Sequence, residues 1–170
     1  MAKLGENAVK KYLESKGLKV EKIPEREIKT VDFAVHSKTG LAFYLEEKTL
    51  EPGSLEWKRI DPIYNTIARH VYEAVKQFKS VNPARRVPNV LSLTNLDPAR
   101  DVNDLFTALT GQAITRSGKI VKLEKFGGEA KDLTLIDLYL WFDGEELSGY
   151  IWEDEAKPNY EAVLKKLLQL

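Results

Sequence analysis

Residues 31–49 constrain the fold most, because two segments of alternating apolar and polar residues flank a short turn. Residues 31–36 and 41–49 are rich in β-branched and aromatic side chains, which is typical of strands, and Gly40 can adopt the positive φ of a turn. Together these signals predict a β-hairpin with a loop of residues 38–40. The simplest register predicts these pairs: Ser37 with Leu41, Val35 with Phe43, Phe33 with Leu45, and Asp32 with Glu46.

Because side chains alternate along a strand, this register predicts an apolar face and a face that carries Asp32, Glu46 and Lys48. Two carboxylates directly opposite each other repel, and burial raises the proton affinity of at least one of them. A divalent cation would relieve both penalties. Mg²⁺ prefers carboxylate, carbonyl and water oxygens. We therefore expect an Mg²⁺ or Mn²⁺ site formed by Asp32, Glu46 and the backbone carbonyl of Glu47, with Lys48 in reach of a metal-bound water or a scissile phosphate.

The spacing of these residues resembles a known signature. Asp32, thirteen intervening residues and then Glu46-Glu47-Lys48 look like the D…(D/E)-x-K motif of the PD-(D/E)XK nuclease superfamily. Residues 4–18, with the Gly5-Glu6 pair, are similar to the first helix of its archaeal Holliday-junction-resolvase branch. The resemblance covers roughly residues 4–95. One departure is Thr30-Val31 before Asp32, where many members have Pro or Gly-x-x.

The resemblance implies a restriction-endonuclease-like α/β fold, in which a mixed central sheet is flanked by helices. It also implies catalytic roles for Asp32, Glu46, Lys48 and Glu6, with Glu6 as an outer or second-metal ligand. The alternative for Glu6 is a first-turn acid that the helix dipole favours.

Hydrophobic periodicity, taken independently of the motif, predicts an αβββαβ order in the first half of the chain. We expect a single domain over residues 1–170, with its core at about 1–95 and a C-terminal elaboration at about 96–170 that includes a β-hairpin and a final helix. The hairpin turns at Asp143-Gly144. The expected helices are 2–16, 64–79, 101–110 and 159–170, and the expected strands are 18–23, 31–36, 41–49, 90–95, 120–126, 133–142 and 147–152.

The charge balance gives a mixed signal about a nucleic-acid partner. The formal net charge is +0, whereas nucleic-acid-binding domains are commonly basic. Residues 1–85 nevertheless hold 16 Lys and Arg against 12 Asp and Glu, and residues 86–170 hold 10 against 14. The basic surplus therefore follows the predicted site.

Several side chains near that site are candidates for nucleic-acid contact. In nucleases of the resembling family, the helix after the E-x-K strand often presents Gln, Lys or Arg to the site, and Trp57 beside basic residues could stack on a base. For each residue alone, a solvated face is the alternative, and for Asp137 we expect a structural hydrogen bond or salt bridge. The candidates for nucleic-acid binding are Lys58, Arg59, Arg69, Lys76, Gln77, Arg85 and Arg86.

Composition excludes several other classes. The absence of cysteine excludes disulfides, thiolate zinc sites and a Cys nucleophile. No apolar run reaches the length of a membrane span, and the N-terminus has no signal-peptide core, so we expect no membrane partner and a cytoplasmic location.

The leading hypothesis is an Mg²⁺- or Mn²⁺-dependent nuclease that hydrolyses duplex or branched DNA, as a restriction or repair enzyme. One alternative is a catalytically silent protein of the same fold that binds nucleic acid or protein. Another is an RNA-directed nuclease subunit. The resemblance also implies that a homodimer could cut two strands.

Overall fold

The computed structural model describes residues 2–24, 29–52, 63–123, 133–153 and 157–170. In its first half the order of helices and strands is αβββαβ, which confirms the prediction from periodicity. The elements are α1 (Ala2–Ser15), β1 (Lys19–Lys22), β2 (Phe33–Ser37), β3 (Gly40–Leu50), α2 (Ile63–Val81), β4 (Asn89–Asn95), α3 (Val102–Thr110), β5 (Gln112–Ile114), β6 (Ile120–Lys122), a 3₁₀ turn (Leu133–Leu135), β7 (Leu138–Asp143), β8 (Glu146–Trp152) and α4 (Pro158–Leu168).

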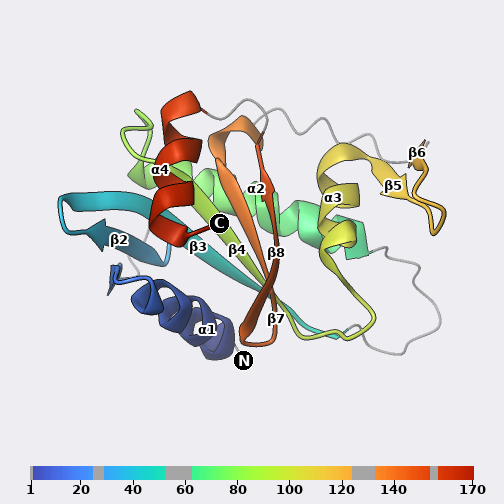
Figure 1. The fold of residues 1–170 in the computed structure, drawn as a ribbon, viewed down its shortest axis with the longest axis horizontal. Coiled ribbons are helices and arrows are strands. Elements are labelled where there is room, and N and C mark those ends of the chain that lie inside the picture. The colour runs from blue at the N-terminus through green and yellow to red at the C-terminus, as the bar shows by residue number, and fades with distance from the viewer. Residues whose placement is uncertain (1, 25–28, 53–62, 124–132, 154–156) are drawn as a thin grey trace.

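A mixed six-stranded sheet with the order β1-β2-β3-β4-β7-β8 forms the centre of the molecule (Figure 1). β3, β4 and β7 are parallel, and the other neighbours are antiparallel. Apolar residues of α1 and α4 pack on one face, and those of α2 and α3 pack on the other. The chain therefore has an α/β fold whose sheet is covered by helices on both sides, as expected.

The central strands read as nearly continuous apolar runs because both of their faces are covered. Every residue of β4 is buried, and so are Leu138 to Phe142 of β7. β7 lies between β4 and β8, so the C-terminal half of the chain completes the sheet that the first half begins.

The predicted hairpin register is confirmed at its centre and wrong near the turn. Phe33 pairs with Leu45 and Val35 with Phe43, but Ser37 pairs with Gly40 rather than with Leu41. A bulge between Val35 and His36 shifts the register by one residue, because a bulge places two residues of one strand opposite one of its partner.

For the second half, two expected strands need correction and one strand was missed. Residues 133–142 are not one strand, because a 3₁₀ turn precedes β7 and the Asp137 N–H donates to Asn89 O in the connection. β5 was not expected, since three residues carry too little periodicity. Of the expected strand 120–126, β6 covers Ile120–Lys122, and residues 124–126 lie outside the described part. The hairpin at Asp143-Gly144 is confirmed.

Among the described helices, none is long and apolar enough to cross a membrane.

Candidate active site

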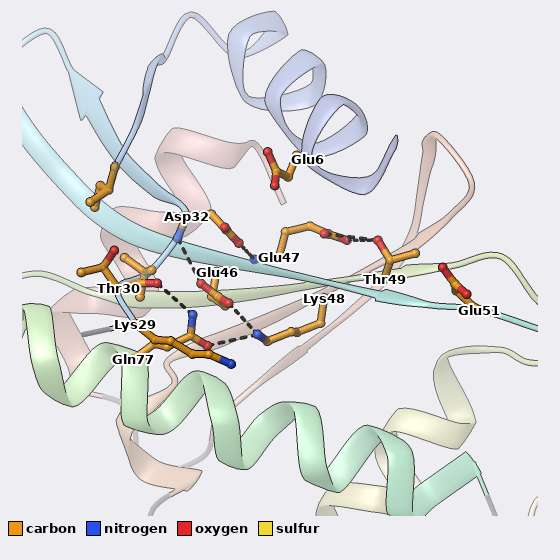
Figure 2. A pocket seen from close by; sticks show the side chains of 12 residues that line it. Glu6, Lys29, Thr30, Asp32, Glu46, Glu47, Lys48, Thr49, Glu51 and Gln77 are labelled. Atoms are coloured by element: carbon orange, nitrogen blue, oxygen red, sulfur yellow. Dashed lines mark hydrogen bonds and ion pairs between the residues drawn. The ribbon is translucent and has the colours of Figure 1, made fainter. Parts of the chain in front are cut away.

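A pocket of about 430 Å³ opens where β2 separates from β3, between α1 and α2 (Figure 2). In Figure 2, Glu6 approaches from α1 on one side of β3, and Gln77 approaches from α2 on the other. The residues that line the pocket are Glu6, Ile23, Lys29, Thr30, Val31, Asp32, Glu46, Glu47, Lys48, Thr49, Glu51 and Gln77.

Alternation along β3 divides its polar side chains between the two sides of the sheet. Glu46 and Lys48 project toward α2, where the Lys48 ammonium donates to Gln77. Glu47 and Thr49 project toward α1, where both lie against Gly5. The side chain of Glu47 thus lies on the opposite face from Glu46, as the sequence predicts.

Asp32 is joined to β3 by two hydrogen bonds between side chain and backbone. Its N–H donates to Glu46 Oε2 at 3.0 Å, and its Oδ2 accepts from the Glu47 N–H at 2.8 Å. The expectation that Asp32 pairs with Glu46 as a strand residue is wrong, because β2 begins at Phe33. The two residues are in contact all the same, but through the Asp32 backbone N–H, while the Asp32 carboxylate itself accepts from the Glu47 N–H.

Lys48 is held by one charged and one neutral acceptor. Its Nζ lies 2.7 Å from Glu46 Oε1 and 3.1 Å from Gln77 Oε1. The Gln77 amide donates from Nε2 to Thr30 O at 2.8 Å, which leaves Oε1 to face the ammonium. Of these side chains, Glu46 is 2% exposed and Gln77 is 8% exposed, so the arrangement is shielded from bulk water.

The buried carboxylates have raised proton affinities. Burial raises the pKa of Glu46 to about 7; the nearby Asp32 charge adds to the rise, and Lys48 opposes it. Burial also raises the pKa of Glu47 to about 7, although Thr94 and Thr49 partly offset it. The pKa of Asp32 is raised by burial, against the stabilising Glu47 N–H and Lys22.

A lysine that the motif does not contain neutralises part of this charge. Lys22 of β1 forms an ion pair with Glu6, and its Nζ lies 3.7 Å from Asp32 Oδ1. Sequence reasoning missed Lys22, which pairs with Phe33, the residue directly after Asp32. Extending the predicted register to the first strand would have found it.

The backbone of Glu47 faces the same edge as Asp32. Tyr44 N–H donates to Pro88 O, and Leu50 O accepts from Leu96 N–H, so even-numbered β3 residues turn their backbone groups toward β4. The N–H and C=O of one strand residue point to the same side. The Glu47 carbonyl therefore points, with its N–H, toward the edge where Asp32 lies.

These donors fit a hard divalent cation. Within the described residues, no group of three or more His, Cys, Asp or Glu side chains is arranged to hold a metal ion. Mg²⁺, however, commonly takes only one or two carboxylates and keeps several waters. Asp32, Glu46 and the Glu47 carbonyl are of the right chemical type for such a set. Each carboxylate already has a cationic neighbour, which is Lys48 at Glu46 and Lys22 at Asp32 and Glu6.

Of the predicted nucleic-acid-binding residues that the structure describes, only Gln77 lines the pocket. Arg69 is exposed near Glu73, at 3.9 Å, and Lys76 lies over the ring of Tyr72. Arg86 is exposed. Trp57, Lys58 and Arg59 lie outside the described residues.

Arg85 instead contacts Asp137, whose side chain is 0% exposed. Asp137 also accepts from the Asn89 N–H at 2.9 Å. Asp137 therefore takes part in a buried structural salt bridge, as expected from the sequence.

A histidine close to the pocket was also missed. His70 of α2 lies 3.8 Å from Glu73, which in turn lies 3.9 Å from Lys48. Burial lowers the pKa of His70, and the neighbouring Arg69 and Lys48 charges lower it further. Its position one turn before Glu73 is no different from that of any other helix residue, so the sequence carries no signal for it.

No protein-family model, curated protein or solved structure matches this chain.

Proposed function

We propose that this chain is a nuclease of the PD-(D/E)XK type, with a restriction-endonuclease-like fold, which uses Mg²⁺ or Mn²⁺ to hydrolyse phosphodiester bonds in DNA. One observation carries the proposal: Asp32, Glu46 and Lys48 meet in one pocket with the Glu47 carbonyl facing the same edge. The αβββαβ order and the mixed sheet between helices are compatible with that fold.

The raised proton affinities support a cation between the acids. A carboxyl that titrates near neutral pH is poorly compensated by its protein neighbours, and a divalent ion supplies the missing positive charge. When bound, an Mg²⁺ or Mn²⁺ ion polarises a phosphate oxygen and lowers the pKa of a water.

The protein groups have distinct roles under this proposal. Asp32 and Glu46 hold the cation, and Asp32 is itself oriented by the Glu47 N–H. Glu46 and Gln77 hold the ammonium of Lys48, so that it can stabilise negative charge that grows on the phosphate. Removing one such preorganised donor typically costs about 3 kcal/mol in the barrier, or roughly a hundredfold in rate.

The test combines cleavage with metal binding. Supercoiled plasmid and a labelled four-way junction are incubated with Mg²⁺, with EDTA as the blank. We expect cleavage by the wild type, and loss of cleavage in Asp32→Asn and in Lys48→Met. Lys38→Met, at the exposed β2–β3 turn, is the matched control. Cleavage that persists in both site variants would place the activity elsewhere.

A catalytically silent binding module is the second candidate. Two observations favour it. Lys48 forms an ion pair with Glu46 at 2.7 Å, and the whole chain has a net charge of +0. Titration with Mn²⁺ separates the two proposals, because a self-contained ion pair gains nothing from a divalent ion. Binding that is lost in Asp32→Asn supports the nuclease.

The substrate, the assembly and the location belong to the same proposal. We propose duplex or branched DNA in the cytoplasm as the target, and a homodimer as the form that cuts both strands. An RNA hairpin and an RNA duplex, assayed beside the DNA substrates, test the alternative of an RNA-directed nuclease subunit. If the RNA substrates are cleaved faster than the DNA substrates, RNA rather than DNA is the target.

A further inference from the structure

A basic β-ribbon stands apart from the central sheet. β5 and β6 form a separate two-stranded antiparallel sheet, and Figure 1 shows it beyond α3, at the end of the molecule away from β2. We call residues 112–122 the β5–β6 arm. Leu123 N–H donates to Gly111 O at its base, and Gly118 adopts a φ of 78° in its turn.

The charge of the arm is positive throughout. It contains Arg116, Lys119 and Lys122 and no Asp or Glu, although residues 86–170 as a whole carry 14 acids against 10 bases. All three basic side chains are exposed. Arg116 and Lys119 lie at the turn, and Lys122 pairs with Gln112 at the end of β6.

The arm also exposes apolar side chains that its own fold does not bury. Ile114 pairs with Ile120, and these residues are 46% and 61% exposed, while Val121 is 41% exposed. Isolated two-stranded ribbons are marginally stable, so apolar residues on them usually pack against something. DNA presents phosphates beside the apolar parts of its sugars and the methyl groups of its bases. An exposed apolar pair next to basic side chains is complementary to such a surface.

We propose that the β5–β6 arm binds duplex DNA, with Arg116, Lys119 and Lys122 on phosphates and the isoleucine pair against the groove. A two-stranded ribbon fits the major groove. Because the arm carries three basic residues and no acidic residue, its charge favours a polyanion such as DNA over a strand of another protein. This proposal rests on the nuclease proposal for its ligand, and it assigns DNA binding to residues distinct from the pocket.

The experiment measures binding without cleavage. Fluorescence anisotropy with a labelled DNA duplex in EDTA, over a range of salt concentrations, compares the wild type with Arg116→Gln/Lys119→Gln/Lys122→Gln. The matched control is Lys19→Gln/Lys38→Gln/Lys166→Gln, which removes three exposed lysines from other elements. Circular dichroism checks that both triple variants keep the wild-type fold.

We expect the arm variant to bind at least about tenfold more weakly, and the slope of log K against log salt to fall by up to about 3, because each phosphate contact contributes about 0.9. The control should bind as the wild type does. Equal binding by the arm variant and the control overturns the proposal. The same titration is run with a labelled RNA duplex, and weaker binding of the arm variant to RNA but not to DNA also overturns the proposal.

A second measurement uses the wild type only, so it does not depend on how a variant folds. Hydrogen exchange of the arm should slow when the DNA duplex is added, and unchanged exchange there counts against the arm. Since neither measurement needs a metal ion, failure of the nuclease proposal would leave a positive result intact. Conversely, a silent arm would leave Mn²⁺ binding at Asp32 and Glu46 unaffected.

Discussion

Gln77 fixes the position of Lys48: its Nε2 donates to Thr30 O at 2.8 Å, and its Oε1 accepts from the Lys48 ammonium at 3.1 Å. We expect Gln77→Leu to lower kcat by about tenfold or more and to change KM little, because Lys48 would keep its charge and lose its orientation. Steady-state cleavage kinetics measure both constants. Lys76→Leu, on the exposed side of α2, is the control, and an equal loss in that variant would point to a general effect on the helix.

Without a divalent ion, the stability of the protein should depend on pH through Glu46. The pKa of its carboxyl is 4.5 in the unfolded chain and about 7 in the folded one, so the folded state binds more protons between these values. The free energy of unfolding therefore falls as pH rises through this window, by about 2 kcal/mol for this group. Urea unfolding in EDTA at pH 5.5 and pH 8 measures the difference.

A substitution of Glu46 separates its contribution to the pH dependence of stability from that of Glu47. Glu46→Gln should remove about half of the pH dependence, because the pKa of Glu47 is also about 7. The exposed Glu51→Gln should leave it unchanged. A Glu46→Gln variant that keeps the full pH dependence of the wild type in EDTA contradicts the raised pKa of Glu46, since His70, whose pKa is lowered, is present in both proteins. Mg²⁺ should add most stability at the higher pH, where the acids are ionised.

Under the metal-site proposal, Lys22 would compete with a divalent ion for Asp32 and Glu6. Its ammonium pairs with Glu6 and lies 3.7 Å from Asp32 Oδ1. Lys22→Met keeps the apolar part of the side chain and removes the charge, so we expect Mn²⁺ to bind about threefold to tenfold more tightly, since like charges at this distance repel. Isothermal titration calorimetry measures the affinity and the stoichiometry. Lys19→Met on the same strand is the control, and weaker binding by Lys22→Met would mean that Lys22 orients Asp32.

The sequence predicted those parts of the fold and site that depend on local periodicity. Alternation alone places Phe33 opposite Leu45, and it places Glu46 and Lys48 on one face and Glu47 on the other. The motif spacing predicted that Asp32 lies next to β3. The contact is made by hydrogen bonds between side chain and backbone rather than by strand pairing.

The remaining features depend on how the strands pair and pack, which the pattern of the predicted hairpin alone does not encode. The bulge at Val35/His36 depends on how the hairpin closes, and the approach of Lys22 depends on the pairing of β1 with β2. The sequence made Arg85 a candidate for DNA binding because it lies in a basic loop. Its partner, Asp137, is 52 residues away in the chain, so the salt bridge could not be read from the surrounding sequence.

Gly5 has a steric role that the resemblance alone does not explain. A Cβ at this position would lie 2.0 Å from Glu47 Oε1 and 2.8 Å from Thr49 Oγ1. Ala usually stabilises a helix by up to about 1 kcal/mol relative to Gly, but here we expect Gly5→Ala to destabilise the protein by about 1–3 kcal/mol through overpacking. Glu47→Ala should restore most of this loss in the double variant. Urea unfolding of both single variants and the double variant gives the coupling, and additive effects would show that the two residues do not clash.

Arg85 should contribute to stability rather than to DNA affinity. Its guanidinium contacts the buried Asp137, and its carbonyl accepts from Lys157 Nζ at 3.2 Å and from the Tyr160 hydroxyl, which ties α4 to the loop after α2. Because Arg85→Gln leaves the Asp137 charge without its partner, we expect a loss of about 3 kcal/mol in the free energy of unfolding. The exposed Arg86→Gln is the neighbouring control and should lose little. DNA binding measured by anisotropy, at a temperature where both variants are folded, should keep the wild-type salt dependence in Arg85→Gln. A shallower salt slope in that variant would instead assign Arg85 to the DNA-binding surface.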